Sequence, residues 1–237
     1  IKVAFFRENG QIGLVKTVQV LPQQTTTVPF VNDNFVAVLP NFEDHTFASL
    51  VFDAQSLKFF RENLLRIEDW LSRLLILRAM SDMVRFAKMK STEFAQLETE
   101  EFLSEMTNNK FTFEIALGFF SVAASEFSPS EVRKTLWTQR FEALIKFVER
   151  ESRPEIIQVI KPFLLECCFD SKHVQLLKEV LEEVHPLSSK LKLSMADKWS
   201  VLFKMWNKKE FSKVQFNMLK EYLLSLDKSD SRKLQMA

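Results

Sequence analysis

Glycine is scarce in this chain, and its scarcity limits the folds that the chain can adopt. Three of the 237 residues are glycine, namely Gly10, Gly13 and Gly118. An average protein contains about 7% glycine, much of it in turns that need a positive φ angle. Two of the three glycines fall within the first 13 residues, where turns between strands need them. The rest of the chain is therefore predicted to form long helices joined by short polar turns.

Residues 1–53 have the alternating pattern of short β-strands. The opening run IKVAFF alternates, ENGQIG marks a turn, and LVKTVQV resumes the alternation. The runs TTTVPFV, NFVAVLP and TFASLVFD complete a set of four or five strands. Such a set is half of a β-sandwich, with open edges and a small core, so we expect it to pack on another part of the protein.

From Ala54 onward the apolar residues recur with the helical period of about 3.6. We therefore predict a mainly α protein: a partial β-sandwich domain at 1–53, then a C-terminal α-helical domain at 54–237. Short connections between antiparallel helices are typical of a superhelical array similar to HEAT or armadillo stacks, although no strict sequence repeat is present. The predicted helices span residues 54–67, 68–88, 91–107, 111–126, 129–151, 154–169, 172–184, 194–207 and 212–226.

Three helix starts carry a recognisable signal. The sequences SPSE at 128–131 and SRPE at 152–155 have the S-x-x-E pattern of a capping box, with proline at or near the first helical position. The sequence SMAD at 194–197 is a weaker version. The helix at 68–88 is apolar over a wide arc and is predicted to be buried between layers.

The composition is that of a globular protein whose positive and negative charges nearly balance. Lys and Arg total 32 against 31 Asp and Glu, so the formal net charge is +1. A balanced charge attracts neither nucleic acid nor an anionic membrane surface, and neither is an expected partner. No run of about 18 apolar residues is free of charges, so no membrane segment is predicted. The 24 phenylalanines are expected to form the core.

The two cysteines, Cys167 and Cys168, are adjacent. Neighbouring Cα atoms are about 3.8 Å apart, which is shorter than the usual disulfide range of about 4.4–6.8 Å. They lie in an apolar helical run, so we expect buried, reduced thiols rather than a redox or metal site. Reduced cysteines are typical of the cytoplasm, which is weakly favoured, while the compartment itself stays open.

The three histidines do not have the spacing of a zinc peptidase. Such enzymes need the pattern H-E-x-x-H on a helix, with the glutamate as general base, and a further glutamate ligand. No pair among His45, His173 and His185 has this spacing, so each is predicted to be solvated or locally capped. No local signature of a Ser-His-Asp or Cys-His nucleophile is present either.

Residues 39–85 contain a β-edge with Asn41, Asp44 and Phe47, followed by SRLLILRAMSDMVR at 72–85. They resemble the junction between the small β-sandwich and the helical domain in zinc aminopeptidases of the aminopeptidase N family, closest to actinobacterial-type members. The family's pattern is a β-edge N-x-x-D-x-(aromatic) followed by S-R-x-x-x-W-x-x-x-x-D-M-V-R. In this sequence Leu77 stands where tryptophan is common, and Phe47 comes one position after the family's aromatic residue. Further on, KWSVL at 198–202 resembles the family's R-W-x-V-L helix, and residues 226–230 resemble a later turn. The positions that carry the junction are Leu39, Pro40, Asn41, Asp44, Phe47, Val51, Asp53, Ser56, Leu57, Ile67, Asp69, Leu71, Ser72, Arg73, Arg78, Asp82, Met83, Val84 and Arg85.

The charges of this junction have a structural interpretation. Asp69 and Arg73 are four apart on one predicted helix, in the favourable order for an ion pair of about 0.2–0.5 kcal/mol. Asp82 is placed to meet Arg78 or Arg85 in the same way. We expect these charges to hold the first helices against the β-edge rather than to perform catalysis.

The resemblance implies a noncatalytic C-terminal segment of a zinc-dependent aminopeptidase. In that family the helical domain closes over a catalytic domain and lines the cavity through which peptides reach the zinc. The H-E-x-x-H motif and the family's G-A-M-E-N strand are missing here, so we assign no catalytic, cofactor-binding, metal or substrate-channel residue. The expected partners are the remainder of the parent peptidase and, through it, peptides; the zinc belongs to the parent's catalytic domain. Both ends of the chain look truncated against the family.

Two alternatives stay open. The chain is a helical-repeat scaffold or subunit of a larger assembly, in which case the reading frame begins close to Ile1. Alternatively, a groove of the array binds peptides without chemistry, in which case peptides raise the melting temperature.

Overall fold

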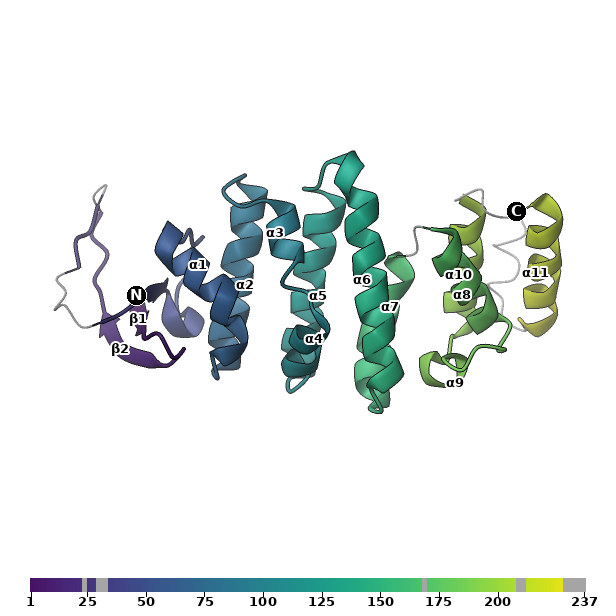
Figure 1. Ribbon diagram of the computed structural model, residues 1–237, viewed down its shortest axis with the longest axis horizontal. Helices are drawn as coiled ribbons and strands as arrows, with labels where there is room; N and C mark the ends of the chain where they lie inside the picture. The colour runs from purple at the N-terminus through teal and green to yellow at the C-terminus, as the bar shows by residue number, and fades with distance from the viewer. Residues whose placement is uncertain (23–24, 29–33, 168–169, 208–211, 228–237) are drawn as a thin grey trace. The chain divides into compact units, whose positions relative to one another are not determined.

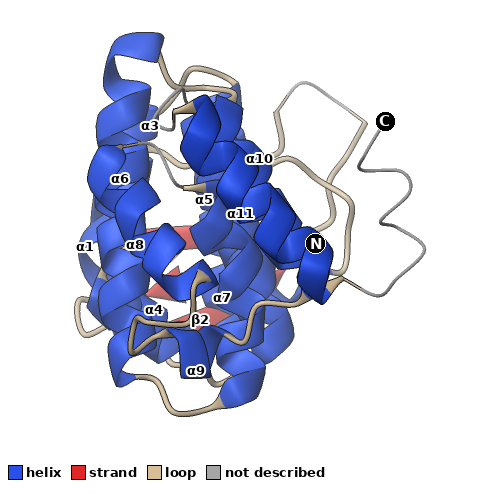
Figure 2. Ribbon diagram, turned by 90° about the vertical axis from the view of Figure 1, so that its right-hand side faces the viewer, coloured by secondary structure: helices blue, strands red, loops and turns tan. Residues whose placement is uncertain are grey.

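A computed structural model describes residues 1–22, 25–28, 34–167, 170–207 and 212–227 (Figure 1). The described chain is mainly helical with a small sheet, as predicted (Figure 2). It divides into two compact units, Ile1–Arg133 and Lys134–Ala237. The change from strands to helices falls between residues 40 and 54. A separate domain at 1–53, with the rest of the chain as a second domain, stays a prediction, and so does the HEAT-like arrangement.

The sheet of the first unit has three antiparallel strands in the order β2-β1-β3. These are β1 (Lys2–Phe6), β2 (Ile12–Thr17) and β3 (Ala37–Pro40). The central strand β1 is buried, because it has a neighbour on each side and helices of its unit nearby. The turn before β2 contains Gly10 at φ 85°, and a Cβ placed there would lie 3.0 Å from the Cβ of Arg66.

The predicted strand TFASLVFD is wrong, because residues 47–53 have no strand conformation. This segment instead turns Leu50 and Phe52 into the core, and the ring of Phe52 lies 4.9 Å from that of Phe60 in the first helix. Of the predicted strand TTTVPFV, residues 25–28 have no strand conformation and 29–31 lie outside the described residues. The described residues thus form one sheet, and the second layer of a sandwich stays a prediction.

Five α-helices follow in the first unit. They are α1 (Ala54–Asn63), α2 (Trp70–Arg85), α3 (Ser91–Ala95), α4 (Glu100–Met106) and α5 (Lys110–Ser125), with short 3₁₀ turns at Phe42–Asp44 and Leu64–Arg66. As predicted from its wide apolar arc, α2 is buried, and it packs against α5. Its buried apolar side chains are Leu75, Ile76, Leu77, Ala79, Met80, Met83 and Val84.

The predicted single helix at 91–107 is two helices separated by a turn. Thr99 begins α4, because its hydroxyl accepts a hydrogen bond from the N–H of Phe102 at 3.1 Å. The break also allows two rings to reach the same partner in α5: Phe94 and Phe102 have ring centroids 4.8 and 5.5 Å from that of Phe120. Burial of three aromatic rings outweighs the continuity of one surface helix.

The boundary between the units falls inside α6 (Ser130–Arg150). The second unit continues with α7 (Pro154–Glu166), α8 (Ser171–Leu181), α9 (Ser188–Leu191), α10 (Met195–Asn207) and α11 (Lys213–Leu226). The four-residue helix α9 had no counterpart in the sequence prediction. No helix in the described ranges is both long and apolar enough to cross a membrane.

Of the three predicted helix caps, the weakest signal is the one confirmed. Ser194 and Asp197 form a reciprocal box at α10: the serine Oγ accepts from the aspartate N–H at 3.2 Å, and the aspartate Oδ2 accepts from the serine N–H at 2.9 Å. By contrast, the N-cap residue of α7 is Arg153 rather than Ser152, and no side chain caps this helix. Glu151 accepts from the N–H groups ahead of α7, and the hydrogen bond from the Arg153 side chain is the main reason that its pKa falls to about 2. Ser128 lies two residues before α6 and donates to the carbonyl of Ala123.

Candidate functional site

The junction that carries the family resemblance begins with a tight turn after β3. Asn41 is buried at the turn and has a left-handed backbone, with φ 54°. Its Nδ2 donates to Asp44 Oδ1 at 3.1 Å and to the carbonyl of Thr46 at 2.5 Å, and its Oδ1 accepts from the N–H of Thr46 at 3.1 Å. Asparagine tolerates this conformation better than most residues. One side chain therefore fixes the path of six residues.

The turn is tied to α2 by Arg78. Its guanidinium lies 3.7 Å from the carboxylate of Asp44 and 6.0 Å from the ring centroid of Phe47. The prediction that charges hold a helix against the β-edge is thus confirmed for Arg78, although its partner is Asp44 rather than Asp82. Both side chains are partly exposed, so the pair contributes at most about 1 kcal/mol.

Two aspartates of the junction start helices in the same way. At α1, Asp53 accepts from the N–H of Ser56 at 2.9 Å and from its hydroxyl at 2.6 Å, and at α2, Asp69 accepts from Ser72 at 2.8 and 2.6 Å. Burial would raise the pKa of Asp53, but the hydrogen bonds from Ser56 outweigh burial and lower it. The hydroxyl of Ser56 also accepts from the N–H of Val38 at 3.0 Å, which joins β3 to α1.

The predicted ion pair between Asp69 and Arg73 is wrong, because each side chain has another use. The aspartate faces the start of α2, as described above. Arg73 is buried, and its guanidinium donates to the carbonyls of Ile67 and, at 2.9 Å, Leu65. It thereby holds down the connection between α1 and α2, whose carbonyls have no helical partner. Asp53, Asp69 and Arg73 are thus occupied in structural hydrogen bonds.

The histidines have three unrelated environments. In the first unit, His45 Nε2 lies 2.8 Å from Glu43 Oε2, and that carboxylate also contacts Lys2. In the second unit, the Nδ1 of His185 accepts from the N–H of Leu187 at 3.2 Å, as expected for a locally capped histidine.

His173 contradicts the prediction of a solvated or capped side chain. It is 5% exposed, and its ring stacks on that of Phe141 in α6 with 3.8 Å between centroids. Burial is the main reason that the pKa of His173 is lowered, with the carboxylates of Asp170 and Glu142 acting in the opposite direction. The neutral imidazole is therefore the form that the folded unit favours.

The possible metal ligands among the described residues come together at most in pairs. No group of three histidine, cysteine, aspartate or glutamate side chains is close enough to hold a metal among the described residues. The Sγ of Cys167 is buried, as predicted, and contacts the carbonyl of Phe163 at 3.0 Å. Cys168 lies outside the described residues. No chemical step is assigned to a metal in this chain.

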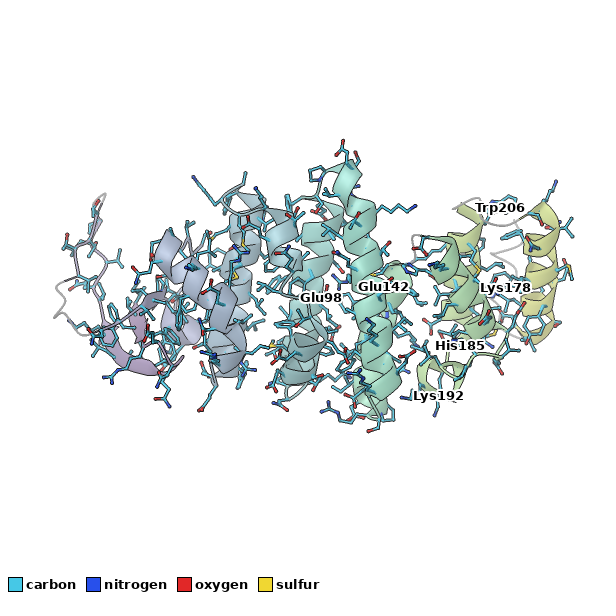
Figure 3. The ribbon with its side chains drawn as sticks, viewed as in Figure 1. Glu98, Glu142, Lys178, His185, Lys192 and Trp206 are labelled. Carbon is cyan, nitrogen blue, oxygen red and sulfur yellow. The ribbon has the colours of Figure 1, made fainter. Side chains whose placement is uncertain are left out.

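A cleft of about 380 Å³ lies between α8 and α11. Lys178 and Glu182 form one wall, 3.9 Å apart, and Figure 3 shows Lys178 in the space between the two helices. The volume of the cleft is large enough for a large side chain. Lys178 and Glu182 can form polar contacts with such a group, but they are not a nucleophile–base pair. The residues of α11 that line the other wall are Gln215, Met218, Leu219 and Tyr222.

Sequence reasoning missed this cleft, although Met218 and Tyr222 at a spacing of four were a usable signal. A second cleft of about 290 Å³ lies between α1 and α3. Its walls are charged, and Arg61 there pairs with Glu93 at 3.1 Å.

The second pair of resembling segments meets inside the second unit. Trp199 in KWSVL donates from its indole Nε1 to the carboxylate of Asp227 at 2.9 Å, and both side chains are buried. Next to it, Lys198 Nζ lies 2.7 Å from Glu183 Oε1. Of the turn at 226–230, residues 228–230 lie outside the described part of the chain. Two segments that were matched separately are therefore joined by one buried hydrogen bond.

No protein-family model matches this chain, and no curated protein is significantly similar to it. The resemblance at residues 39–85 thus stands on the residue pattern alone.

Proposed function

We propose that this chain is the noncatalytic C-terminal segment of a zinc aminopeptidase of the aminopeptidase N type. In this proposal it shapes the access of peptides to a catalytic domain that lies outside the 237 residues. The observation that supports the proposal is the pattern at residues 39–85, in which four polar residues have specific structural partners, namely Asn41, Asp53, Asp69 and Arg73. A motif used for structure in this way fits a junction that positions a domain.

The bond between Trp199 and Asp227 gives further support. The two segments were matched to the family independently and are 28 residues apart in the sequence. Their contact is what a common origin of both matches predicts. In this interpretation the chain contributes shape and rigidity, and the chemistry of peptide hydrolysis belongs to its partner domain.

The test compares the native protein with the isolated chain. The transcript upstream of Ile1 is sequenced, and we expect H-E-x-x-H with a second glutamate on a following helix. The native protein, captured with an antibody against this chain, is expected to exceed 27.8 kDa and to release aminomethylcoumarin from aminoacyl substrates until a chelator removes its zinc. The purified 237-residue chain, as the matched control, should release none and hold no stoichiometric zinc.

Two results would contradict the proposal. Turnover by the purified chain itself would place catalysis inside these residues. A reading frame that begins close to Ile1, with no catalytic domain encoded, would favour the helical scaffold instead. The scaffold hypothesis is supported by one specific observation, the exposed apolar side chains of α10 and α11, which are typical of an interaction surface.

A further inference from the structure

Helix α11 has apolar side chains on two sides. Leu219, Leu223 and Leu224 are buried on the inner side, where α11 packs on α10. A second row, Val214, Met218 and Tyr222, is 67%, 68% and 41% exposed. These three residues are four apart, so they form one continuous ridge on the helix surface.

The ridge has a charged flank with a definite order. Lys213 and Glu221 are exposed and lie eight residues apart, each next to an end of the ridge, with Asn217 between them. Eight residues of helix correspond to about 12 Å. The flank therefore carries a cation at its N-terminal end and an anion at its C-terminal end.

We propose that this ridge is the interface between two copies of the chain, with α11 packed antiparallel on its counterpart about a two-fold axis near Met218. A two-fold axis reverses the helix, so that Val214 faces the partner's Tyr222 and Met218 faces the partner's Met218. The same rotation brings Lys213 of each copy close to the partner's Glu221, so the interface contains two equivalent ion pairs. In a parallel arrangement the two charged flanks would lie on opposite sides of the interface, and Lys213 would not meet the partner's Glu221.

The cleft beside the ridge fits this arrangement. It is lined by Met218 and Tyr222 of the ridge and has room, at about 380 Å³, for a large side chain of the second copy. The ridge is short, so we expect a reversible dimer rather than an obligate one.

Charge reversal at the two flank positions tests the pairing directly. The variants Lys213→Glu and Glu221→Lys each place like charges together at both ends of the interface, and each should weaken dimerisation about tenfold or more. An equimolar mixture of the two variants should restore association as a heterodimer, because both contacts are then between opposite charges. The variant with both changes should restore the homodimer. Mass is measured by sedimentation equilibrium, from 27.8 kDa toward twice that value.

The controls separate association from folding. A glutamate near the N-terminus of α11 and a lysine toward its C-terminus both suit the helix dipole, so neither single variant should unfold the helix. Circular dichroism checks this point. Lys134→Glu, which changes net charge on an exposed site of α6, should dimerise as the wild type does, and Met218→Glu should abolish the dimer.

The proposal is overturned by a wild-type chain that stays monomeric up to ~0.5 mM. It is equally overturned if the single variants associate normally, or if their mixture does not recover. None of these readouts depends on peptidase activity, so this inference and the proposed function stand or fall separately.

Discussion

Asn41 combines two roles that no other side chain supplies together. Its backbone is left-handed, and its amide satisfies both the N–H and the carbonyl of Thr46. Alanine at this position would add backbone strain and leave two polar groups of the turn without partners. Residues of this kind are fixed by local geometry rather than by hydrophobic burial.

Asn41→Ala is therefore expected to lower the free energy of unfolding by about 2–4 kcal/mol, measured by urea denaturation. Asn41→Gly is the matched control, because glycine keeps the left-handed backbone and loses only the amide contacts. Its loss should be smaller by roughly 1 kcal/mol. Equal losses in the two variants would show that backbone strain has no part.

His173 should make the stability of the second unit depend on pH. Burial lowers its pKa in the folded protein below the ordinary value of 6.5. As the pH falls from 6.5 toward the folded pKa, the unfolded chain binds a proton that the folded unit resists, so the free energy of unfolding decreases. The contribution of the neutral His173 to the free energy of unfolding is therefore fully present above pH 6.5. The groups around the ring are Asp170, Glu142 and Lys172.

His173→Phe should flatten the pH dependence of the urea midpoint below pH 6.5 and leave the midpoint at pH 8 little changed, because phenylalanine can stack on Phe141. His185→Gln provides the comparison, since that histidine is only partly buried, and it should retain the wild-type profile. A profile that stays equally steep without His173 would assign the effect to another group.

At the scale of elements, helix starts decide where the chain changes direction. Ser194 caps α10 through a reciprocal pair with Asp197, whereas Ser152 stands before α7 without capping it by its side chain. Ser194→Ala should thus lower the free energy of unfolding by about 1 kcal/mol. Ser152→Ala should change it by less than about 0.5 kcal/mol. A reversal of this order, seen by thermal melting, would contradict the assignment of the cap.

The apolar periodicity predicted the bounds of most helices to within a few residues. Apolar residues that recur every 3.6 positions form one continuous face only in a helix, and that face can then be buried. The periodicity failed where distant residues decide. The split at Thr99 depends on Phe120, which attracts rings from both α3 and α4, and the fate of residues 47–53 depends on Phe60. For the same reason the buried histidine and the cleft were not predicted, since their neighbours come from other helices.

At the scale of the whole molecule, the two compact units each have a core of their own. Leu177→Ala in α8 and Leu117→Ala in α5 remove similar, fully buried side chains, one from each unit. Each should cost about 2–5 kcal/mol. Hydrogen exchange should show the lost protection in the unit that carries the substitution, and equal loss in both units would mean that the chain unfolds as one cooperative body.

Gly10 and Gly118 differ in how freely they can be replaced. At Gly10 a side chain meets two obstacles at once, a φ of 85° and the Cβ of Arg66 at 3.0 Å. At Gly118, in the middle of α5, a Cβ would meet no atom within 4 Å. In a library selected only for folding, position 10 should therefore return glycine almost alone, whereas position 118 should drift to alanine and other helix formers. Glycine is thus indispensable at one of these sites and replaceable at the other.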